Sequence, residues 1–253
     1  MTIQKMTLDI KKQLKYIIRE SLMFCRIDLT KNLKYDRLSK IILNQIMSKK
    51  DCNALDIGAH DGDFLKLFLK NSPSGKHVAF EPLPHKFDAL VKNFGATNTV
   101  YSYALSNYEG TDEFCFVKNA EAYSGLKNRR YDVENPIIEK IKVDVRTLDS
   151  LNIASKIDFI KIDVEGGEYD ALRGGIKLLQ RDKPFLLFEY GTGASDFYHT
   201  TSKAMYEFLC TEIGYSINTL DGYINDALSP LSFEEFNHYY TTGDEYYFVA
   251  SVI

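Results

Sequence analysis

Short apolar runs alternate with helix-like stripes in the middle of the chain, and this alternation limits the possible folds more than any other feature. The runs at 53–57, 77–81 and 99–105 have the length and composition of buried strands. Between them, apolar residues recur at helical spacing, and Gly95 closes the second helical stretch. Strands that alternate with helices in this way predict a parallel sheet with right-handed crossovers.

The same rhythm returns in the second half of the chain. Apolar runs at 157–163 and 184–190 predict two further buried strands. We therefore expect an α/β fold with one doubly wound, mostly parallel sheet. The remaining predicted elements are helices at about 168–180 and 201–213 and strands at 215–220 and 246–252.

The stretch 111–147 interrupts this rhythm after the third predicted strand. Its residues predict strands at 111–117 and 137–145, separated by a polar segment. Long connections in compact domains are often lids over functional sites. We therefore expect a β-rich insertion that lies over the edge of the active site.

Two amphipathic stripes, at 8–25 and 38–46, precede the first strand. They predict an N-terminal helical extension over 1–50, followed by the main domain over 51–253. Residues 1–50 carry twelve Lys and Arg against four Asp and Glu, whereas the remainder carries nineteen against thirty-one. The basic helices could pack on the acidic body as a solvated arm, or they could contact a membrane surface or a partner.

The composition argues against several classes of function. The net charge of −4 disfavours nucleic acid as a partner, because phosphate binding needs a basic surface. Neither a secretory signal nor an apolar run of membrane-spanning length is recognisable. The four cysteines form no CxxC pair, which indicates reduced thiols. We expect a cytoplasmic protein with no integral membrane segment, and a homo-oligomer is one possibility.

A tight glycine bend follows the first strand, in the segment 56–62 of sequence DIGAHDG. A strand, a glycine bend and a helix N-terminus together bring backbone N–H groups toward a ligand. His60 stands at the second glycine position of a dinucleotide-binding turn, which favours a smaller group than a pyrophosphate. We expect Gly58 to allow close backbone approach, Gly62 to let the helix begin, and Asp56 to bind an amino group. An ordinary strand-to-helix turn is the alternative.

An acidic residue, Glu81, ends the second strand, 19 residues after Gly62. A carboxylate there can accept hydrogen bonds from both hydroxyls of a ribose. The alternative is an acid placed favourably at a helix N-terminus. Its pairing with the glycine bend favours a nucleoside-containing ligand.

The segment 160–168, of sequence IKIDVEGGE, carries charged residues at the end of a predicted strand. Strand alternation could place Lys161, Asp163 and Glu165 on one side, if the strand stays extended that far. Asp163 could then be a general base, an orienting group or a metal ligand, since ligands bind at this edge of open α/β sheets. Lys161 and Glu165 could share its role or be structural, and we expect Glu168 to cap the next helix.

Two more candidates follow the strand at 184–190. Glu189 is either a site residue or half of a loop salt bridge. Asp163 with Glu165 or Glu189 could hold Mg²⁺, which prefers oxygen ligands, although no spacing demands a metal. His199 is either a general base or an ordinary solvated histidine.

Taken in order, these segments resemble the FkbM-type methyltransferases. The resemblance covers about 53–190, and residues 1–50 and most of the stretch after Tyr190 carry no matching motif. It rests on LDIGAHDG at 55–62, FEP at 80–82, ALS at 104–106, Gly110, TLD at 147–149 and IDFIKIDVEG at 157–166.

The resemblance implies a seven-stranded, Rossmann-like class I methyltransferase sheet with an antiparallel last strand at 246–252. It implies S-adenosylmethionine as methyl donor and a hydroxyl acceptor on a sugar, a surface glycan or a natural product. It leaves the base open among Lys161, Asp163, Glu165 and His199. The implied donor contacts are Asp56, Gly58, Ala59, His60 and Gly62 on the methionine side, Glu81 and Pro82 at the ribose, Ala104, Leu105 and Ser106 near the adenine, and Asp163 at the junction of donor and acceptor.

Two other functions fit part of the pattern. An NAD-dependent dehydrogenase or epimerase predicts a third glycine in the bend and a catalytic Tyr-Lys or His arrangement. The altered bend and the KIDVEG segment argue against it. A non-catalytic domain that binds a nucleoside ligand predicts binding without turnover, and fold resemblance by itself does not prove activity.

Overall fold

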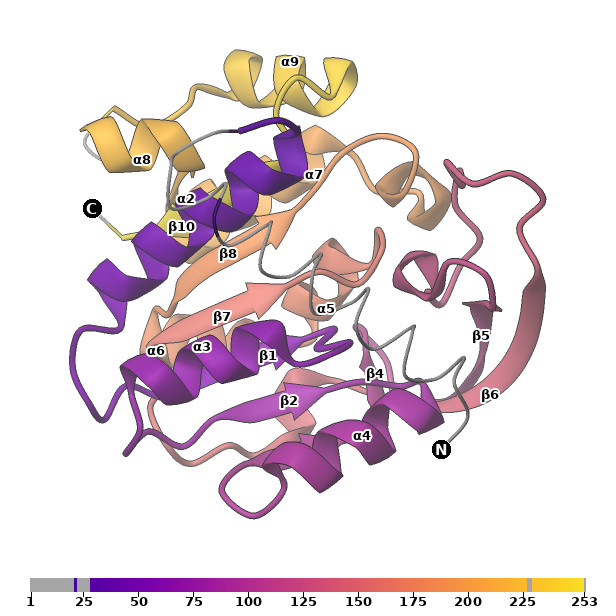
Figure 1. Ribbon diagram of the computed structural model, residues 1–253. Helices are drawn as coiled ribbons and strands as arrows, with labels where there is room; N and C mark the ends of the chain where they lie inside the picture. The colour runs from indigo at the N-terminus through magenta and orange to yellow at the C-terminus, as the bar shows by residue number, and fades with distance from the viewer. Residues whose placement is uncertain (1–20, 22–27, 227–228, 253) are drawn as a thin grey trace.

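Seven strands form the central sheet of the computed structural model, which describes Ser21 and residues 28–226 and 229–252 (Figure 1). The strand β10 is antiparallel to both neighbours, whereas β3, β2, β1, β7 and β8 pair in parallel. This confirms the predicted doubly wound sheet with an antiparallel last strand. In spatial order the strands are β3 (Thr99–Tyr101), β2 (Val78–Phe80), β1 (Ala54–Ile57), β7 (Phe159–Ile162), β8 (Phe185–Glu189), β10 (Tyr247–Ser251) and β9 (Ser216–Thr219).

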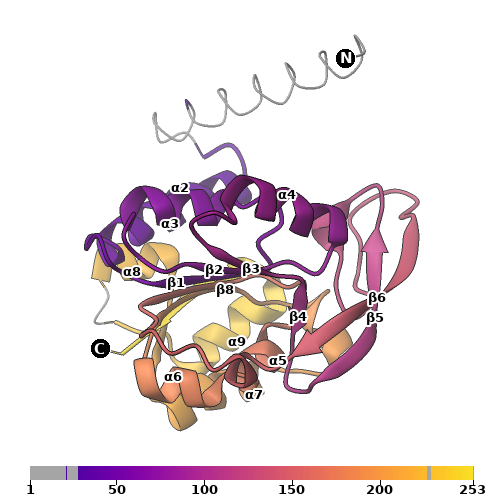
Figure 2. The same ribbon diagram turned by 90° about the horizontal axis from the view of Figure 1, so that it is seen from below.

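Helices cover both faces of this sheet (Figure 2). Strand alternation divides the core between them. Leu55 and Ile57 pack in the layer of α5 and α9, whereas Ala54 packs in the layer of α2 and α3. Asp56 therefore faces the layer of α3. One layer holds α2 (Lys31–Ile46), α3 (Asp63–Asn71), α4 (Pro84–Phe94) and α8 (Leu220–Asp226), and the other holds α5 (Glu168–Arg173), α6 (Ile176–Asp182), α7 (Ser202–Tyr206) and α9 (Phe233–Thr242).

The third predicted strand, 99–105, is divided at Ser102, so the prediction of one strand was wrong. The first part, β3, stays in the central sheet, and β4 (Tyr103–Leu105) joins a second sheet of order β4-β6-β5. A continuous run of strand-forming residues does not reveal where the chain leaves one sheet for another. The strands β5 (Gly110–Val117) and β6 (Ile138–Arg146) are the predicted insertion, and they stand beside the carboxyl edge of the central sheet (Figure 1).

The predicted helix at 168–180 is two helices, α5 and α6, separated by Gly174 and Gly175. A Cβ on Gly174 would lie 2.1 Å from the carbonyl oxygen of Ser106, so this turn packs directly on the chain that follows β4. The helix predicted at 201–213 begins as α7 and continues as a π-helix over Glu207–Ile213.

Two helices near the C-terminus, α8 and α9, were not predicted. The start of α9 carries a capping box: Ser232 Oγ accepts a hydrogen bond from Glu235 N, and the Glu235 carboxylate accepts one from Ser232 N. The Ser-x-x-Glu spacing is present in the sequence and is a helix-start signal that would have located α9.

Of the two predicted N-terminal helices, the one at 38–46 exists as α2 and begins earlier, at Lys31. The helix predicted at 8–25 lies outside the described residues, apart from Ser21. Lys34 of α2 forms ion pairs with Glu245 at 3.0 Å and Asp221 at 2.6 Å. The helix α2 therefore packs on the main domain, as the prediction of a basic arm on an acidic body supposes. Across the described ranges, every helix is too short or too polar to cross a membrane.

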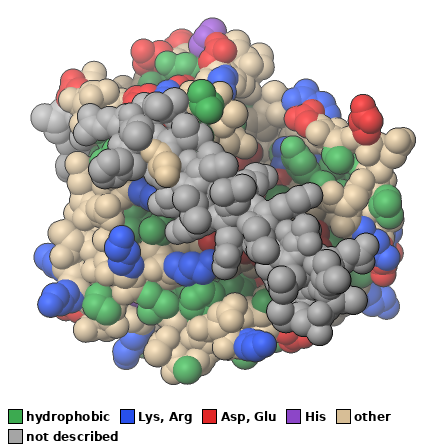
Figure 3. Space-filling view, in the orientation of Figure 1, with side chains coloured by type: hydrophobic (Ala, Val, Ile, Leu, Met, Phe, Trp, Pro, Cys, Tyr) green, Lys and Arg blue, Asp and Glu red, His purple; other side chains and the backbone are tan. Residues whose placement is uncertain are grey.

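Charge is unevenly distributed over one face of the molecule (Figure 3). Asp and Glu side chains gather near α9 at the top of this view, and Lys and Arg predominate over the lower half. Lys34 of the basic helix α2 forms its two ion pairs with Asp221 of α8 and with Glu245, just before β10.

The strands β1 and β7 approach each other closely where both end. Gly58, directly after β1, has a φ of +77°, and a Cβ there would lie 2.0 Å from the carbonyl oxygen of Asp163. Asp163 N donates to the carbonyl of Ile57 at 3.1 Å. A glycine is required here both by the positive φ and by the lack of space.

We expect Gly58→Ala to lower the free energy of unfolding by about 3 kcal/mol or more, because backbone strain and a backbone clash add. Gly214→Ala is the matched control. Gly214 also has a positive φ, +83°, but no heavy atom lies within 4 Å of its Cβ position, so strain alone should cost about 1 kcal/mol. Urea unfolding of both variants measures the difference, and equal losses would contradict the proposed clash.

Candidate active site

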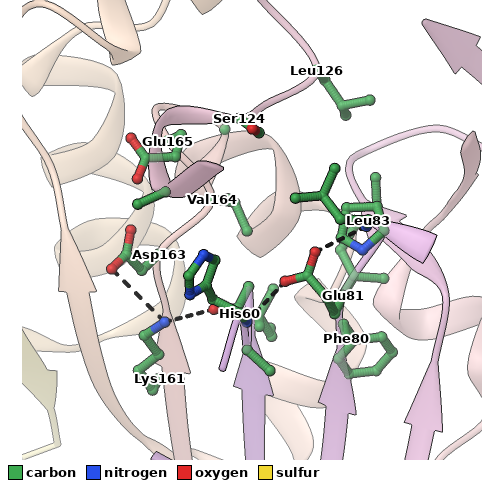
Figure 4. A pocket seen from close by; sticks show the side chains of 18 of the residues that line it. His60, Phe80, Glu81, Leu83, Ser124, Leu126, Lys161, Asp163, Val164 and Glu165 are labelled. Atoms are coloured by element: carbon green, nitrogen blue, oxygen red, sulfur yellow. Dashed lines mark hydrogen bonds and ion pairs between the residues drawn. The ribbon is translucent and has the colours of Figure 1, made fainter. Parts of the chain in front are cut away.

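A cavity of about 280 Å³ opens at the carboxyl edge of the central sheet (Figure 4). The chain leaves β1 toward β2 and returns on the other side at β7, so the strand order reverses at this point. Open α/β sheets bind ligands in the crevice that such a reversal creates. The ends of β1, β2, β4 and β7 line the cavity, together with residues of the insertion, Asp36 of α2 and Tyr247 of β10.

The carboxylate of Glu81 faces the glycine bend (Figure 4). Its Oε2 accepts a hydrogen bond from His60 N at 2.8 Å, and its Oε1 accepts one from Leu83 N at 2.9 Å. Glu81 is only 4% exposed, and this burial raises its pKa. A carboxylate offers about four lone-pair positions, so both oxygens retain acceptor capacity for a ligand.

The ring of His60 lines the cavity between Lys161 and Glu81 (Figure 4). His60 has a left-handed backbone, with a φ of 45°. Its Nδ1 lies 3.3 Å from Asp61 Oδ2, and its Nε2 is buried without a hydrogen-bond partner among the described residues. A buried polar atom of this kind is uncommon in folded proteins and points to a ligand or water.

Lys161 connects β1 and β7 at the floor of the cavity. Its Nζ donates to the Gly58 carbonyl at 2.9 Å and lies 3.8 Å from both Asp56 Oδ1 and Asp163 Oδ2. Burial raises the pKa of Asp56 to about 6, although the charge of Lys161 opposes this. A buried ammonium is costly unless it is paired, and these three contacts supply the pairing.

Asp163 follows β7 directly and lines the cavity. Its Oδ2 accepts a hydrogen bond from the Tyr247 hydroxyl at 2.7 Å. Tyr247 stands opposite Glu189 in the register of β8 and β10. Burial, reinforced by the charge of Asp163, raises the pKa of Glu189 well above its usual value, and burial does the same for the pKa of Tyr247.

Glu165 reaches the cavity from a turn, because β7 ends at Ile162 and Glu165 has a φ of 59°. The strand therefore does not stay extended far enough for alternation to place Glu165 beside Lys161. Instead, Glu165 forms an ion pair with Arg129 of the insertion.

Glu168 is buried at the start of α5 and lies outside the cavity lining. Its Oε1 accepts hydrogen bonds from Val164 N at 2.9 Å and Gly166 N at 3.1 Å. The carboxylate thus binds backbone N–H groups just before the helix, as expected of a capping residue. Burial raises the pKa of Glu168 to about 7.

Ion pairs also attach the insertion to the glycine bend. Lys86 of α4 lies 2.7 Å from Asp61 Oδ1 and 3.1 Å from Glu121 Oε2, and Glu121 begins a 3₁₀ turn of the insertion. The insertion contributes Phe114, Ser124 and Leu126 to the cavity lining. This is the position over the site edge that the sequence predicted for it.

The structure brings most of the predicted site residues together and leaves three outside the lining. Asp56 lies beneath the cavity, and Gly62 packs against Leu90 and Phe94. His199 is exposed at the end of the 3₁₀ turn Ser195–Tyr198 and lies outside the lining, which favours the solvated alternative over the general base. The lining includes Gly58, Ala59, His60, Glu81, Pro82, Ala104, Leu105, Ser106, Lys161, Asp163 and Glu165.

The suggested metal site gains no support from side-chain geometry. In the described part of the chain, no group of three or more His, Cys, Asp or Glu side chains is arranged to hold a metal ion. Asp163 and Glu165 instead have protein partners, Tyr247 and Arg129.

The lining residues that sequence reasoning missed include Asp36, Tyr198 and Tyr247. Tyr198 accepts a hydrogen bond from Lys127 N at 3.2 Å, and Tyr247 donates one to Asp163. These residues lie outside the matched motifs and reach the cavity through the packing of distant elements. Tyr247 could have been placed at the cavity only if the antiparallel pairing of Tyr247 with Glu189 had been known.

The sheet order, the antiparallel β10 and the cavity at the carboxyl edge define a class I methyltransferase fold. The family model described as "Methyltransferase FkbM domain" matches residues 56–217. The chain therefore belongs to the FkbM methyltransferase family.

Two curated relatives are each 28% identical to this chain over the aligned region. One is 2-O-methyltransferase NoeI of Sinorhizobium fredii, aligned over 161 residues that cover 57% of this chain and 65% of the relative. The other is methyltransferase sdnD of Sordaria araneosa, aligned over 152 residues that cover 47% and 59%. The chain thus spans less than two thirds of the length of these relatives.

Solved structures show a distant likeness of fold. Methyltransferase FkbM from Methylobacillus flagellatus KT is 17% identical, with a TM-score of 0.46 and coverage of 74% of this chain and 48% of that chain. The plantazolicin methyltransferase BpumL, solved in complex with SAH, is 13% identical, with a TM-score of 0.41 and coverage of 95% and 97%.

The raised pKa of Glu168 predicts a pH-dependent stability. A pKa of about 7 lies above the ordinary glutamate value of 4.5, so the folded state favours the protonated form. The stability that this provides is present below pH 4.5 and is lost as the pH rises through 7. We expect Glu168→Gln to gain about 2 kcal/mol relative to the native protein between pH 5 and pH 8.

Urea unfolding at a series of pH values measures this gain, with Glu113→Gln, at an exposed carboxylate, as the control for removing one acidic group. A difference between Glu168→Gln and the native protein that stays constant over this range would contradict the prediction.

Proposed function

We propose that this protein is an S-adenosylmethionine-dependent O-methyltransferase. The observation that carries the proposal is the placement of the Glu81 carboxylate opposite the glycine bend, within one cavity of about 280 Å³. A carboxylate with free acceptor capacity suits the two ribose hydroxyls of an adenosyl group. Membership of the FkbM methyltransferase family supports the same donor.

The residues present fit such a donor. The unpartnered Nε2 of His60 offers a polar atom for the amino-acid part, beside the backbone of Gly58 and Ala59. Glu81 and Pro82 would hold the ribose. Adenine would lie against the apolar and small residues at the end of β4, namely Ala104, Leu105 and Ser106.

When bound, the donor supplies an activated methyl group on a positively charged sulfur. The protein then has to align the acceptor oxygen behind that methyl group and take up its proton. Among the candidate bases, Lys161 is held by the Gly58 carbonyl and two carboxylates, and Glu165 is paired with Arg129. Asp163 is held as well, by the Tyr247 hydroxyl on Oδ2, but it has a second carboxylate oxygen, and we assign the proton to Asp163 because its carboxylate lines the cavity.

The acceptor that we propose is a hydroxyl on a sugar, a surface glycan or a natural product. Support for an oxygen acceptor comes from the relative named 2-O-methyltransferase NoeI. The acidic residues Asp36 and Asp163 in the lining suit a neutral polyhydroxyl compound better than an anionic one.

We expect S-adenosylmethionine to raise the melting temperature of the protein, because a ligand that binds the folded state stabilises it. NAD should leave the melting temperature unchanged, since His60 occupies the second glycine position of the dinucleotide turn. Thermal unfolding with each ligand makes the comparison. Stabilisation by NAD alone would overturn the proposal in favour of an oxidoreductase.

Replacing Glu81 with Ala is expected to weaken S-adenosylmethionine binding by about 1–3 kcal/mol, through the loss of charge-assisted hydrogen bonds. Isothermal titration calorimetry gives the dissociation constants. Glu113→Ala, outside the cavity on the exposed side of β5, is the control and should keep the native affinity. An unchanged affinity in a folded Glu81→Ala protein would remove the ribose assignment.

A further inference from the structure

Tyr247 reaches the cavity from β10, outside the segment that the family model matches. Its hydroxyl donates to Asp163 Oδ2 at 2.7 Å, and Lys161 Nζ lies 3.8 Å from the same oxygen. A hydrogen-bond donor and a cation thus both meet Oδ2. The Asp163 side chain is 22% exposed and lines the cavity, so the residue can still meet a ligand.

Asp163 stands among several other carboxyl groups. Burial raises the pKa of both Glu168 and Glu189, so these neighbours favour their protonated forms. The Tyr247 hydroxyl bonds Asp163 directly, so these two side chains are held as a pair. The titratable and charged groups around the pair are Asp56 on β1, Lys161 on β7, Glu189 on β8, Glu168 on α5, Asp36 on α2 and Arg129 of the insertion.

The phenol of Tyr247 is itself held in place by α2. The ring centroids of Tyr35 and Tyr247 lie 5.3 Å apart, and the Tyr35 hydroxyl donates to Glu245 Oε2 at 2.6 Å. A tyrosine fixed in this way and buried beside two carboxyl groups remains a protonated donor.

We propose that Tyr247 is a positioning residue, whose hydroxyl fixes Oδ2 of the Asp163 carboxylate and so turns Oδ1 toward the donor's sulfur and the acceptor hydroxyl. This inference rests on the proposed function, because it assumes an S-adenosylmethionine donor in the cavity. It assigns the placement of negative charge in the site to the last strand and α2, two elements outside the matched family segment.

The test needs no identified acceptor. S-adenosylmethionine carries a positive sulfur, whereas S-adenosylhomocysteine has a neutral one and otherwise the same amino-acid and nucleoside parts. A carboxylate oxygen held beside the sulfur should favour the positive ligand by about tenfold. The ratio of the two dissociation constants, measured by calorimetry, therefore reports how closely the Asp163 carboxylate is held to the sulfur.

In the native protein we expect S-adenosylmethionine to bind more tightly than S-adenosylhomocysteine by about tenfold. Asp163→Asn should remove this preference. Tyr247→Phe keeps the ring contact with Tyr35 but loses the hydrogen bond that fixes Oδ2, so the preference should fall by about fivefold. Tyr246→Phe, at the adjacent residue outside the lining, is the matched control and should keep the native preference.

The outcomes separate the two proposals. If the native protein binds neither ligand, the proposed function fails and the inference falls with it. If the native protein binds both ligands without a preference, or if Tyr247→Phe keeps the full native preference, the inference alone is overturned, even where the variant is less stable. A preference that persists in Asp163→Asn would assign the charge near the sulfur to another carboxyl group, such as Glu189, and would also overturn it.

Discussion

The buried ammonium group of Lys161 holds the carboxyl edge of the sheet together at the point where the cavity forms. It donates a hydrogen bond to the carbonyl of Gly58 and lies within ion-pair distance of Asp56 on β1 and Asp163 after β7. Removing such a charge from water is expensive, and these contacts, together with the Phe64 ring 5.5 Å from the ammonium, offset the cost. The geometry of the glycine bend and the position of Asp163 therefore depend on each other. The absence of a side chain at Gly58 lets the two strand ends come close enough for this arrangement.

A second consequence of this packing is a concentration of carboxyl groups in a small, poorly solvated volume. Asp56, Glu168 and Glu189 all have a raised pKa because burial disfavours their charged forms. Asp163 differs from them because a phenol and an ammonium both contact its Oδ2. Environments that separate the protonation states of neighbouring acids are a common way to distinguish their roles in a site.

The insertion completes the cavity and is tied to the central sheet by charge. Lys86 joins Glu121 of the insertion to Asp61 of the glycine bend, and Arg129 joins the insertion to Glu165 after β7. The glycine bend and the turn after β7 thus both line the cavity and hold the insertion through ion pairs. A movement of the insertion would therefore displace residues at both of these segments.

The sequence by itself determined the doubly wound sheet, the presence of the insertion and the meeting of the glycine bend with Glu81, because local periodicity and the parallel topology bring the carboxyl ends of the strands to one edge. Local patterns did not reveal the break at Ser102, because a run of strand-forming residues carries no record of which sheet each part joins. Only the tertiary structure placed His199 outside the site and brought Tyr247 to Asp163, 84 positions earlier in the chain. That contact is set by the antiparallel register of β10 and by the packing of Tyr35 on it, which are long-range choices that no short segment encodes.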